Sequence, residues 1–151
     1  MSNQVAGIVL AAGGSSRFGS PKQLLPWRGK TVLNSVVSTA FDTGLAPVIV
    51  VLGANADQIE PSLPKECVVV RNDAWPEGQS SSIRTGLAQL SEEIDGVLIL
   101  LGDQPQVNPH FCSSIIQKGL ECGKITIPYV NDRRANPVFF PKHTLKRLGQ
   151  V

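Results

Sequence analysis

The chain has 151 residues, of which 42% are hydrophobic and 17% are charged, and its formal net charge is +2. These values are typical of one globular domain spanning residues 1–151, and they exclude an intrinsically disordered chain. Because the lysines and arginines are scattered, whereas nucleic acids and membrane surfaces require a concentrated basic face, we expect neither as a partner.

The chain begins with MSNQVAGIVLAAGG, and we predict that its apolar run over residues 5–11 is a buried strand. The run is short, contains a glycine and lacks the preceding basic region of a signal peptide. No apolar segment of the sequence approaches the length of a membrane span. We therefore expect a cytoplasmic protein.

Three further apolar runs, at residues 47–52, 67–70 and 96–101, predict strands, and two of them (PVIVVLG and GVLILLG) are almost continuously apolar. Such runs are typical of parallel strands that are covered by helices on both faces. Apolar spacing predicts intervening helices over residues 31–41, 79–90 and 109–120, the last beginning after Asn108 with a proline at its first position. This alternation predicts an α/β fold with a doubly wound, mostly parallel sheet in three α/β/α layers.

The last thirty residues carry weaker patterns. KITIP and NPVFF are candidate strands for a small antiparallel addition, and PKHTLKRLGQV predicts a helix from Pro141 to Gly149. Because a fold of this kind would usually continue beyond such a helix, we expect that the chain is truncated at its C-terminal end.

The cysteines indicate packing rather than chemistry. Cys67, Cys112 and Cys122 are widely spaced, form no CxxC pair and have no histidine at zinc-ligand spacing. We expect them to be reduced and mostly buried.

Polar clusters follow three of the predicted strands, where ligands bind in open α/β sheets. After the first strand, Gly13 and Gly14 allow backbone N–H groups to approach a ligand closely. Ser16 adds a hydroxyl, Arg17 a planar fork and Lys22 a mobile charge, which together suit a polyanion such as a triphosphate. The segment matches neither a Walker loop nor GxGxxG.

A carboxylate follows the strand at residues 96–101. Asp103 lies in GDQP, directly after VLILL, at the edge of the sheet that the first loop shares. Mg²⁺ takes one or two carboxylates and completes its shell with phosphates and waters. Asp103 is therefore a candidate Mg²⁺ anchor for a bound nucleotide, although it could also simply open a type I turn.

These segments resemble the molybdenum cofactor cytidylyltransferases, within the MobA-like nucleotidyltransferase superfamily and its Rossmann-like sheet. LAAGGSSRFGSPKQLLPWRGKTVL (10–33) is similar to that family's LAAGxSxRMGxPKxLLPxxGxxLL signature, and NDAWPEGQSSSIRTGL (72–87) is similar to its NxxWxxGxxSS[LI]RxGL segment. GDQP (102–105) and RRANPVFF (133–140) are similar to its metal motif and its GxPVxF stretch.

The resemblance implies an enzyme that transfers CMP from CTP to the phosphate of molybdopterin, with Mg²⁺, and releases pyrophosphate. Arg17, Lys22 and Asp103 would be the catalytic residues, and Asp103 would hold the metal. The segment from Gly78 to Ser82 would line the pocket. The implied nucleotide-binding residues are Leu10, Ala11, Ala12, Gly13, Gly14, Ser16, Arg17, Lys22, Asn72, Gly78, Ser80, Ser81 and Asp103. The product would pass to a molybdoenzyme or to its chaperone.

The identity of the base and of the acceptor remains open between alternatives. Guanylyl-transferring relatives usually show LAGG, whereas this chain has LAAG, and a methyl group at Ala12 would favour a pyrimidine. The alternatives are GTP or another NTP, a sugar-1-phosphate or methylerythritol-phosphate acceptor, and a non-catalytic module that binds the cofactor. The family also carries a C-terminal region rich in Asp and Gly that this sequence lacks, so we expect the 151-residue form to bind nucleotide but catalyse poorly.

Overall fold

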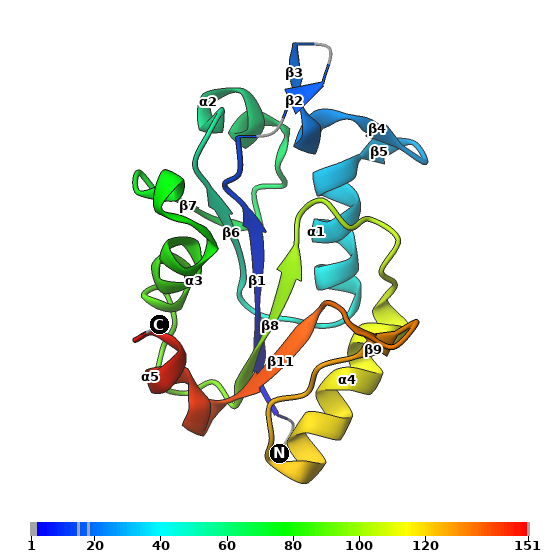
Figure 1. The fold of residues 1–151 in the computed structure, drawn as a ribbon, viewed down its shortest axis with the longest axis vertical. Helices are drawn as coiled ribbons and strands as arrows, with labels where there is room; N and C mark the ends of the chain where they lie inside the picture. The colour runs from blue at the N-terminus through cyan, green and yellow to red at the C-terminus, as the bar shows by residue number, and fades with distance from the viewer. Residues whose placement is uncertain (1–2, 15, 18, 151) are drawn as a thin grey trace.

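The computed structural model describes residues 3–14, 16–17 and 19–150. Its centre is a five-stranded sheet in the order β11-β8-β1-β6-β7 (Figure 1). The strands β1, β6, β7 and β8 run parallel, and β11 is antiparallel to β8. The five strands are Val5–Ala11 (β1), Val48–Leu52 (β6), Val68–Arg71 (β7), Gly96–Leu101 (β8) and Val138–Pro141 (β11).

Helices cover both faces of this sheet, as the sequence predicts. Helices α1 and α4 lie on one face, and α3 and α5 lie on the other (Figure 1). The α-helices are α1 (Val32–Asp42), α2 (Ala56–Ile59), α3 (Gln79–Leu87), α4 (Pro109–Cys122) and α5 (Leu145–Leu148). None of the helices in the described part of the chain has both the length and the hydropathy to cross a membrane.

Two separate apolar clusters follow from the alternation of side chains along each strand. In β1, Val9 and Ala11 pack in the cluster under α1 and α4, whereas Ile8 and Leu10 pack in the cluster under α3. Because both faces of β1, β6 and β8 are covered, these strands are apolar almost throughout. The edge strand β7 is only partly buried.

Local signals account for the helix ends that the sequence predicts best. At the start of α4, the Asn108 side chain accepts a hydrogen bond from the Phe111 N–H at 2.8 Å, and Pro109 occupies the first helical position. Gly123 follows the helix with φ of +66°, a left-handed conformation that suits glycine. At the start of α1, Thr31 accepts from the Asn34 N–H at 3.0 Å.

The structure differs from the sequence predictions in several short segments. KITIP forms no strand, since only Thr126 makes an isolated bridge, with Phe139. The helix predicted over 79–90 ends at Leu87, and the one predicted over 141–149 is divided into a 3₁₀ turn, Lys142–Thr144, and α5. The remaining two-stranded pairs are Ser16–Arg17 (β2) with Ser20–Pro21 (β3), Pro26–Trp27 (β4) with Lys30–Thr31 (β5), and Tyr129–Val130 (β9) with Arg133–Arg134 (β10).

Candidate active site

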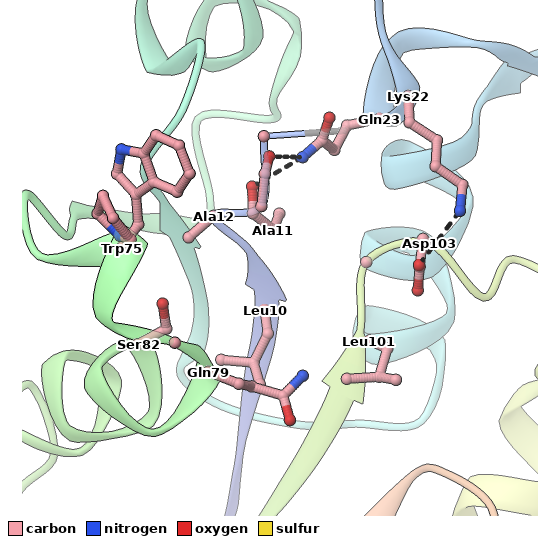
Figure 2. Close-up of a pocket in the computed structure, with 15 residues that line it drawn as sticks. Leu10, Ala11, Ala12, Lys22, Gln23, Trp75, Gln79, Ser82, Leu101 and Asp103 are labelled. Carbon is pink, nitrogen blue, oxygen red and sulfur yellow. Dashed lines mark hydrogen bonds and ion pairs between the residues drawn. The ribbon is translucent and has the colours of Figure 1, made fainter. Parts of the chain in front are cut away.

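A cleft of about 400 Å³ lies at the carboxyl ends of β1 and β8 (Figure 2). From β1 the chain proceeds outward through β6 and β7, and it then returns to the other side of β1 as β8. The cleft therefore occupies the point where the strand order reverses, which is the usual ligand site of open α/β sheets. Its lining residues are Leu10, Ala11, Ala12, Gly13, Gly14, Lys22, Gln23, Trp75, Pro76, Gly78, Gln79, Ser82, Leu101, Gly102 and Asp103.

The close approach of β1 and β8 places Asp103. The Gly102 N–H donates to the Leu10 carbonyl at 2.8 Å, which extends the ladder one residue beyond β8. A Cβ at Gly102 would lie 2.9 Å from that same carbonyl oxygen and 3.1 Å from Ala11 Cβ. A glycine is therefore required for the two strand ends to meet, and the next side chain, Asp103, projects at the mouth of the cleft.

Lys22 and Asp103 meet across this mouth. Lys22 Nζ lies 3.5 Å from a carboxylate oxygen of Asp103, although 81 positions separate the two residues in sequence (Figure 2). Their side chains are 40% and 48% exposed, so both charges remain accessible to a ligand. Among the described residues that line the cleft, Lys22 and Asp103 are the charged ones, and they give one end of the cleft a strongly polar character.

The segment from Ala11 to Gly14 forms the part of the wall that follows β1. Gln23 is 6% exposed, and its Nε2 donates to the carbonyls of Ala11 at 3.0 Å and of Gly13 at 3.2 Å. The carbonyl between them, that of Ala12, accepts from the Ala54 N–H at 3.0 Å. The carbonyls of Ala11, Ala12 and Gly13 are thus each bound by a donor of the protein.

The opposite wall is formed by the start of α3 and the turn before it. Gly78 has φ of +112° and ψ of 178°, a conformation that side chains rarely adopt, and it redirects the chain into the helix. Ser82 and Gln79 line the cleft from α3, and Trp75 lines it from the preceding turn (Figure 2). A Cβ at Gly14 would lie 3.1 Å from the Trp75 ring, so the two walls touch there.

Asn72 holds this second wall together from behind. It is 5% exposed, and its Nδ2 donates to the hydroxyls of Ser81 at 2.9 Å and Ser82 at 3.0 Å. Its Oδ1 accepts from the Ala74 N–H at 2.9 Å. These bonds fix the turn before α3 against the start of that helix.

The structure brings together most of the residues that the sequence singles out. Leu10 to Gly14, Lys22, Gly78 and Asp103 all line one cleft. Asn72, Ser80 and Ser81 are not among the lining residues, because Asn72 and Ser81 are buried in the hydrogen bonds behind the wall. The predicted roles of the Ser16 and Arg17 side chains lie outside the described residues.

Sequence reasoning missed the part that Gln23 plays. Gln23 is a buried amide within the PKQLL segment, next to Lys22. The available signal was a polar residue directly before the apolar pair at Leu24 and Leu25, which an amphipathic turn explains equally well. Only the path of the chain shows that its side chain reaches the carbonyls after β1.

None of the three cysteines is among the residues that line this cleft. All three are free, as predicted, but only Cys112 is buried, whereas Cys67 is partly buried and Cys122 is exposed, so the expectation that they are mostly buried is wrong. Burial, reinforced by the nearby Glu66 carboxylate, raises the pKa of Cys67 to about 11, and burial also raises the pKa of Cys112. Cys67 and Cys112 are therefore poor nucleophiles at neutral pH.

Within the described residues, no three His, Cys, Asp or Glu side chains are grouped so that they could hold a metal ion. Among the lining residues that the structure describes, Asp103 supplies the carboxylate. Such a donor set fits Mg²⁺ or Mn²⁺ that is bound jointly by one carboxylate, phosphates and waters, and it does not fit a zinc site.

The fold is that of an α/β protein with a doubly wound sheet, and its cleft lies at the switch point of that sheet. Residues 7–151 match the model of the MobA-like NTP transferase domain, and the chain belongs to that family.

Known relatives carry different names. Nicotine blue oxidoreductase of Paenarthrobacter nicotinovorans is 38% identical over 104 residues, which are 67% of this chain and 50% of that protein. A probable molybdenum cofactor guanylyltransferase of Bacillus cereus is 27% identical over 133 residues, 87% of this chain and 65% of that protein. The chain thus spans half of the first relative and somewhat under two thirds of the second.

A solved structure with a similar fold is that of Rv0371c from Mycobacterium tuberculosis H37Rv. It is 32% identical with a TM-score of 0.89, and the match covers 100% of this chain and 78% of that one. A complex of Rv0371c with manganese is 31% identical with a TM-score of 0.86, covering 99% and 77%. The predicted α/β fold with a mostly parallel sheet and a small antiparallel addition is confirmed.

Proposed function

We propose that this chain is a nucleotidyltransferase that transfers CMP from CTP to the phosphate of molybdopterin and releases pyrophosphate, with Mg²⁺ as its metal. Membership of the MobA-like NTP transferase domain family supports the reaction class. The LAAG segment, Leu10 to Gly13, supports cytidine as the base, and the likeness of residues 10–33 and 72–87 to the cytidylyltransferase motifs supports the acceptor.

The observation that carries the proposal is the meeting of Lys22 and Asp103 at the switch point, 3.5 Å apart. A cation that binds phosphate oxygens and a carboxylate that binds a divalent cation are the two groups that a metal–triphosphate complex requires side by side. Both remain about half exposed, so a ligand can replace their mutual contact.

The reaction itself needs no nucleophile from the protein. An oxygen of the acceptor phosphate would form the new bond to the α-phosphorus of CTP, and the bond from that phosphorus to the bridging oxygen would break. The electron pair of that bond leaves with pyrophosphate. Positioning of the two substrates and neutralisation of charge are sufficient for such an in-line transfer.

The residues of the chain have distinct parts in this proposal. Lys22, together with Arg17, would bind the phosphates and stabilise pyrophosphate as it leaves. Asp103 would hold the metal, which when bound neutralises phosphate charge. The N–H groups after β1 would face the nucleotide, and Gly78 and Ser82 would line the opposite side. Asn72, Ser80 and Ser81 would support that wall.

Ala12 supports a pyrimidine. It is 7% exposed and lines the cleft, so its methyl group takes up space that a glycine would leave free. A purine needs more room beside this position than a pyrimidine does. GTP remains the alternative donor, because the relative from Bacillus cereus is a probable guanylyltransferase.

A redox function is the second candidate, since one relative is named nicotine blue oxidoreductase. The chain has no GxGxxG segment after β1 that would bind a dinucleotide in the usual way. Reduction of nicotine blue with NADH or NADPH, without any release of pyrophosphate from an NTP, would favour this candidate.

The experiment that tests the proposal is an assay of pyrophosphate release. CTP and GTP are compared with Mg²⁺, with and without molybdopterin, for the wild type, Lys22→Ala and Asp103→Ala. Lys118→Ala and Asp42→Ala are the matched controls, because both side chains are exposed on helices and neither residue lines the cleft. Because we expect the 151-residue form to catalyse poorly, we expect slow release from CTP that depends on Mg²⁺ and on molybdopterin. It should fall to the rate without enzyme in both cleft variants and stay unchanged in the controls.

Each other outcome selects an alternative. Release that survives Lys22→Ala and Asp103→Ala would overturn the assignment of the site. Faster release with GTP would indicate a guanylyltransferase, and release with a sugar phosphate instead of molybdopterin would indicate another acceptor. Binding of Mg·CTP without any release would indicate a module that only binds nucleotide. The proposed recipient, a molybdoenzyme or its chaperone, is tested by transfer of the labelled product to it.

A further inference from the structure

Glutamine is an unusual residue type for a buried position such as that of Gln23. It is 6% exposed, and while its Nε2 makes two hydrogen bonds, its Oε1 is buried without a donor among the described residues. A buried acceptor without a partner costs free energy. Methionine or leucine would fill a similar volume without that cost, so packing alone does not explain a glutamine here.

The orientation of the Gln23 amide follows from its neighbours. Nε2 lies 3.0 Å from the Ala11 carbonyl oxygen and 3.2 Å from that of Gly13 (Figure 2). If the amide were turned over, Oε1 would face these two carbonyl oxygens and be repelled by both. The donor therefore has to point at the wall that follows β1.

These bonds fix peptide planes as well as carbonyls. In a planar trans peptide the C=O group and the N–H group of the next residue point in opposite directions. Because Gln23 holds the carbonyls of Ala11 and Gly13, it directs the N–H groups of Ala12 and Gly14 away from its own side chain. Ala54 holds the Ala12 carbonyl in the same way and so orients the Gly13 N–H.

The N–H groups oriented in this way are available. No acceptor among the described residues binds the N–H of Gly13 or of Gly14, and both glycines line the cleft. A Cβ at Gly13 would meet nothing within 4 Å, so the backbone is open on that side. A free backbone N–H group beside a cleft can donate a hydrogen bond to an anion bound there.

We propose that Gln23 is a positioning residue that sets the backbone from Ala11 to Gly14 for the triphosphate, and that it couples this backbone to Lys22. It occupies the carbonyl oxygens that would repel phosphate and leaves the N–H groups to bind it. Since Lys22 is its direct neighbour in the 3₁₀ turn Lys22–Leu24, the same turn supplies the mobile cation and orients the fixed N–H groups. The inference rests on the proposed function only in that the ligand carries a polyphosphate.

Two substitutions separate the parts of this role. Gln23→Met keeps the length and volume but removes both donors, and Gln23→Glu keeps the shape but replaces the donor with an acceptor that repels the two carbonyls. Gln58→Met is the matched control, because Gln58 is exposed on α2. The probes are magnesium pyrophosphate, Mg·CTP and cytidine, with binding measured by calorimetry and folding by thermal melting.

We expect Gln23→Met to weaken the binding of magnesium pyrophosphate and Mg·CTP at least tenfold, with a larger loss in Gln23→Glu. Binding of cytidine, which carries no phosphate, should stay within twofold of the wild type, as should all binding by Gln58→Met. In the wild type, magnesium pyrophosphate should shift the amide NMR signals of Gly13 and Gly14, and in Gln23→Met these shifts should be lost.

Pyrophosphate binding in Gln23→Met that equals the wild type would overturn this inference alone. Equal losses for pyrophosphate and cytidine would also overturn it, because they would show that Gln23 only supports the fold. If Gln23→Met fails to fold, Gln23→Asn, which keeps the amide but shortens its reach, takes its place with the same expectations. A wild-type chain that binds neither pyrophosphate nor CTP would overturn the proposed function and this inference together.

Discussion

Lys22 and Asp103 illustrate how little a visible ion pair can mean for stability. Their contact is 3.5 Å long, and both side chains are about half exposed. Exposed pairs of this kind contribute about 0–1 kcal/mol, because water and salt screen the charges and two flexible side chains must be ordered. The two residues therefore matter through what they can bind, and their loss should change function far more than the free energy of unfolding.

Cys67 shows the opposite case, in which the surroundings determine what a side chain can do. Its pKa is raised to about 11, first by burial and then by the Glu66 carboxylate. Because the pKa of the folded state lies above the usual value of 9.0, the thiol stays protonated at neutral pH. Because the unfolded chain releases this proton more readily than the folded one, the contribution of Cys67 to the free energy of unfolding is fully present below about pH 9. It is lost as the pH rises toward 11.

We therefore predict slow alkylation of Cys67. At pH 8, iodoacetamide should modify the exposed Cys122 first and Cys67 about 100-fold more slowly than an unperturbed thiol, since two pKa units reduce the thiolate about 100-fold. The rate at Cys67 should increase about tenfold per pH unit up to pH 10. Peptide mass spectrometry measures each cysteine separately. Modification of Cys67 as rapid as that of Cys122 at pH 8 would contradict the prediction.

At the scale of elements, the site depends on how closely β8 approaches β1. Gly102 continues the ladder after β8, and a Cβ there would lie 2.9 Å from the Leu10 carbonyl oxygen and 3.1 Å from Leu33 Cδ1. The backbone oxygen cannot yield as the end of a side chain could. Any larger residue must therefore push the turn that carries Asp103 away from β1.

We predict that Gly102→Ala still folds but loses most of its activity. The variant should lose about 1–3 kcal/mol of stability through overpacking. Its release of pyrophosphate should fall at least tenfold, because Asp103 is displaced relative to Lys22. Ser113→Ala, on the exposed side of α4, serves as the control for both urea unfolding and activity. Activity equal to the wild type in Gly102→Ala would contradict the expected displacement.

The elements that could be predicted from sequence are those whose pattern comes from burial. The apolar runs of β1, β6 and β8 show that both faces are covered, and the signals around Asn108 and Gly123 mark the ends of α4. The short α2 and the two-residue strand pairs carry too few residues to produce a period. The predicted helix from Pro141 to Gly149 is divided because residues 142–144 close as a 3₁₀ turn before α5 begins.

The sequence predicts those features of the site that depend on strand order. Lys22 and Asp103 follow neighbouring parallel strands, so their meeting could be expected from the end that those strands share. Gln23 and Asn72 could not be assigned in the same way. Their parts depend on which carbonyls and hydroxyls a buried amide reaches, and only the tertiary structure determines this.

At the scale of the whole molecule, the cleft lies between two parts of the fold that extend from β1 to either side in the sheet. One part continues through β6 and β7 to α3, and the other contains β8 and β11. The walls come from both parts, with Gly78 and Ser82 on one side and Gly102 and Asp103 on the other. A ligand that spans the cleft therefore contacts both parts of the fold and should stabilise the molecule as a unit.

We predict that Mg·CTP raises the melting temperature of the chain. A ligand at 100 times its dissociation constant stabilises the native state by about 2.7 kcal/mol. For a domain of this size that corresponds to an increase of about 5–10 °C.

Removal of the metal with EDTA should abolish most of this increase in melting temperature, because without the metal the triphosphate would place its negative charge beside Asp103 uncompensated. Lys22→Ala and Asp103→Ala should each reduce the increase, whereas Lys118→Ala should preserve it. Differential scanning calorimetry at fixed protein concentration measures all of these states. An increase of the same size with and without metal would show that Asp103 does not act as a metal ligand, and no increase with any NTP would contradict nucleotide binding in the cleft.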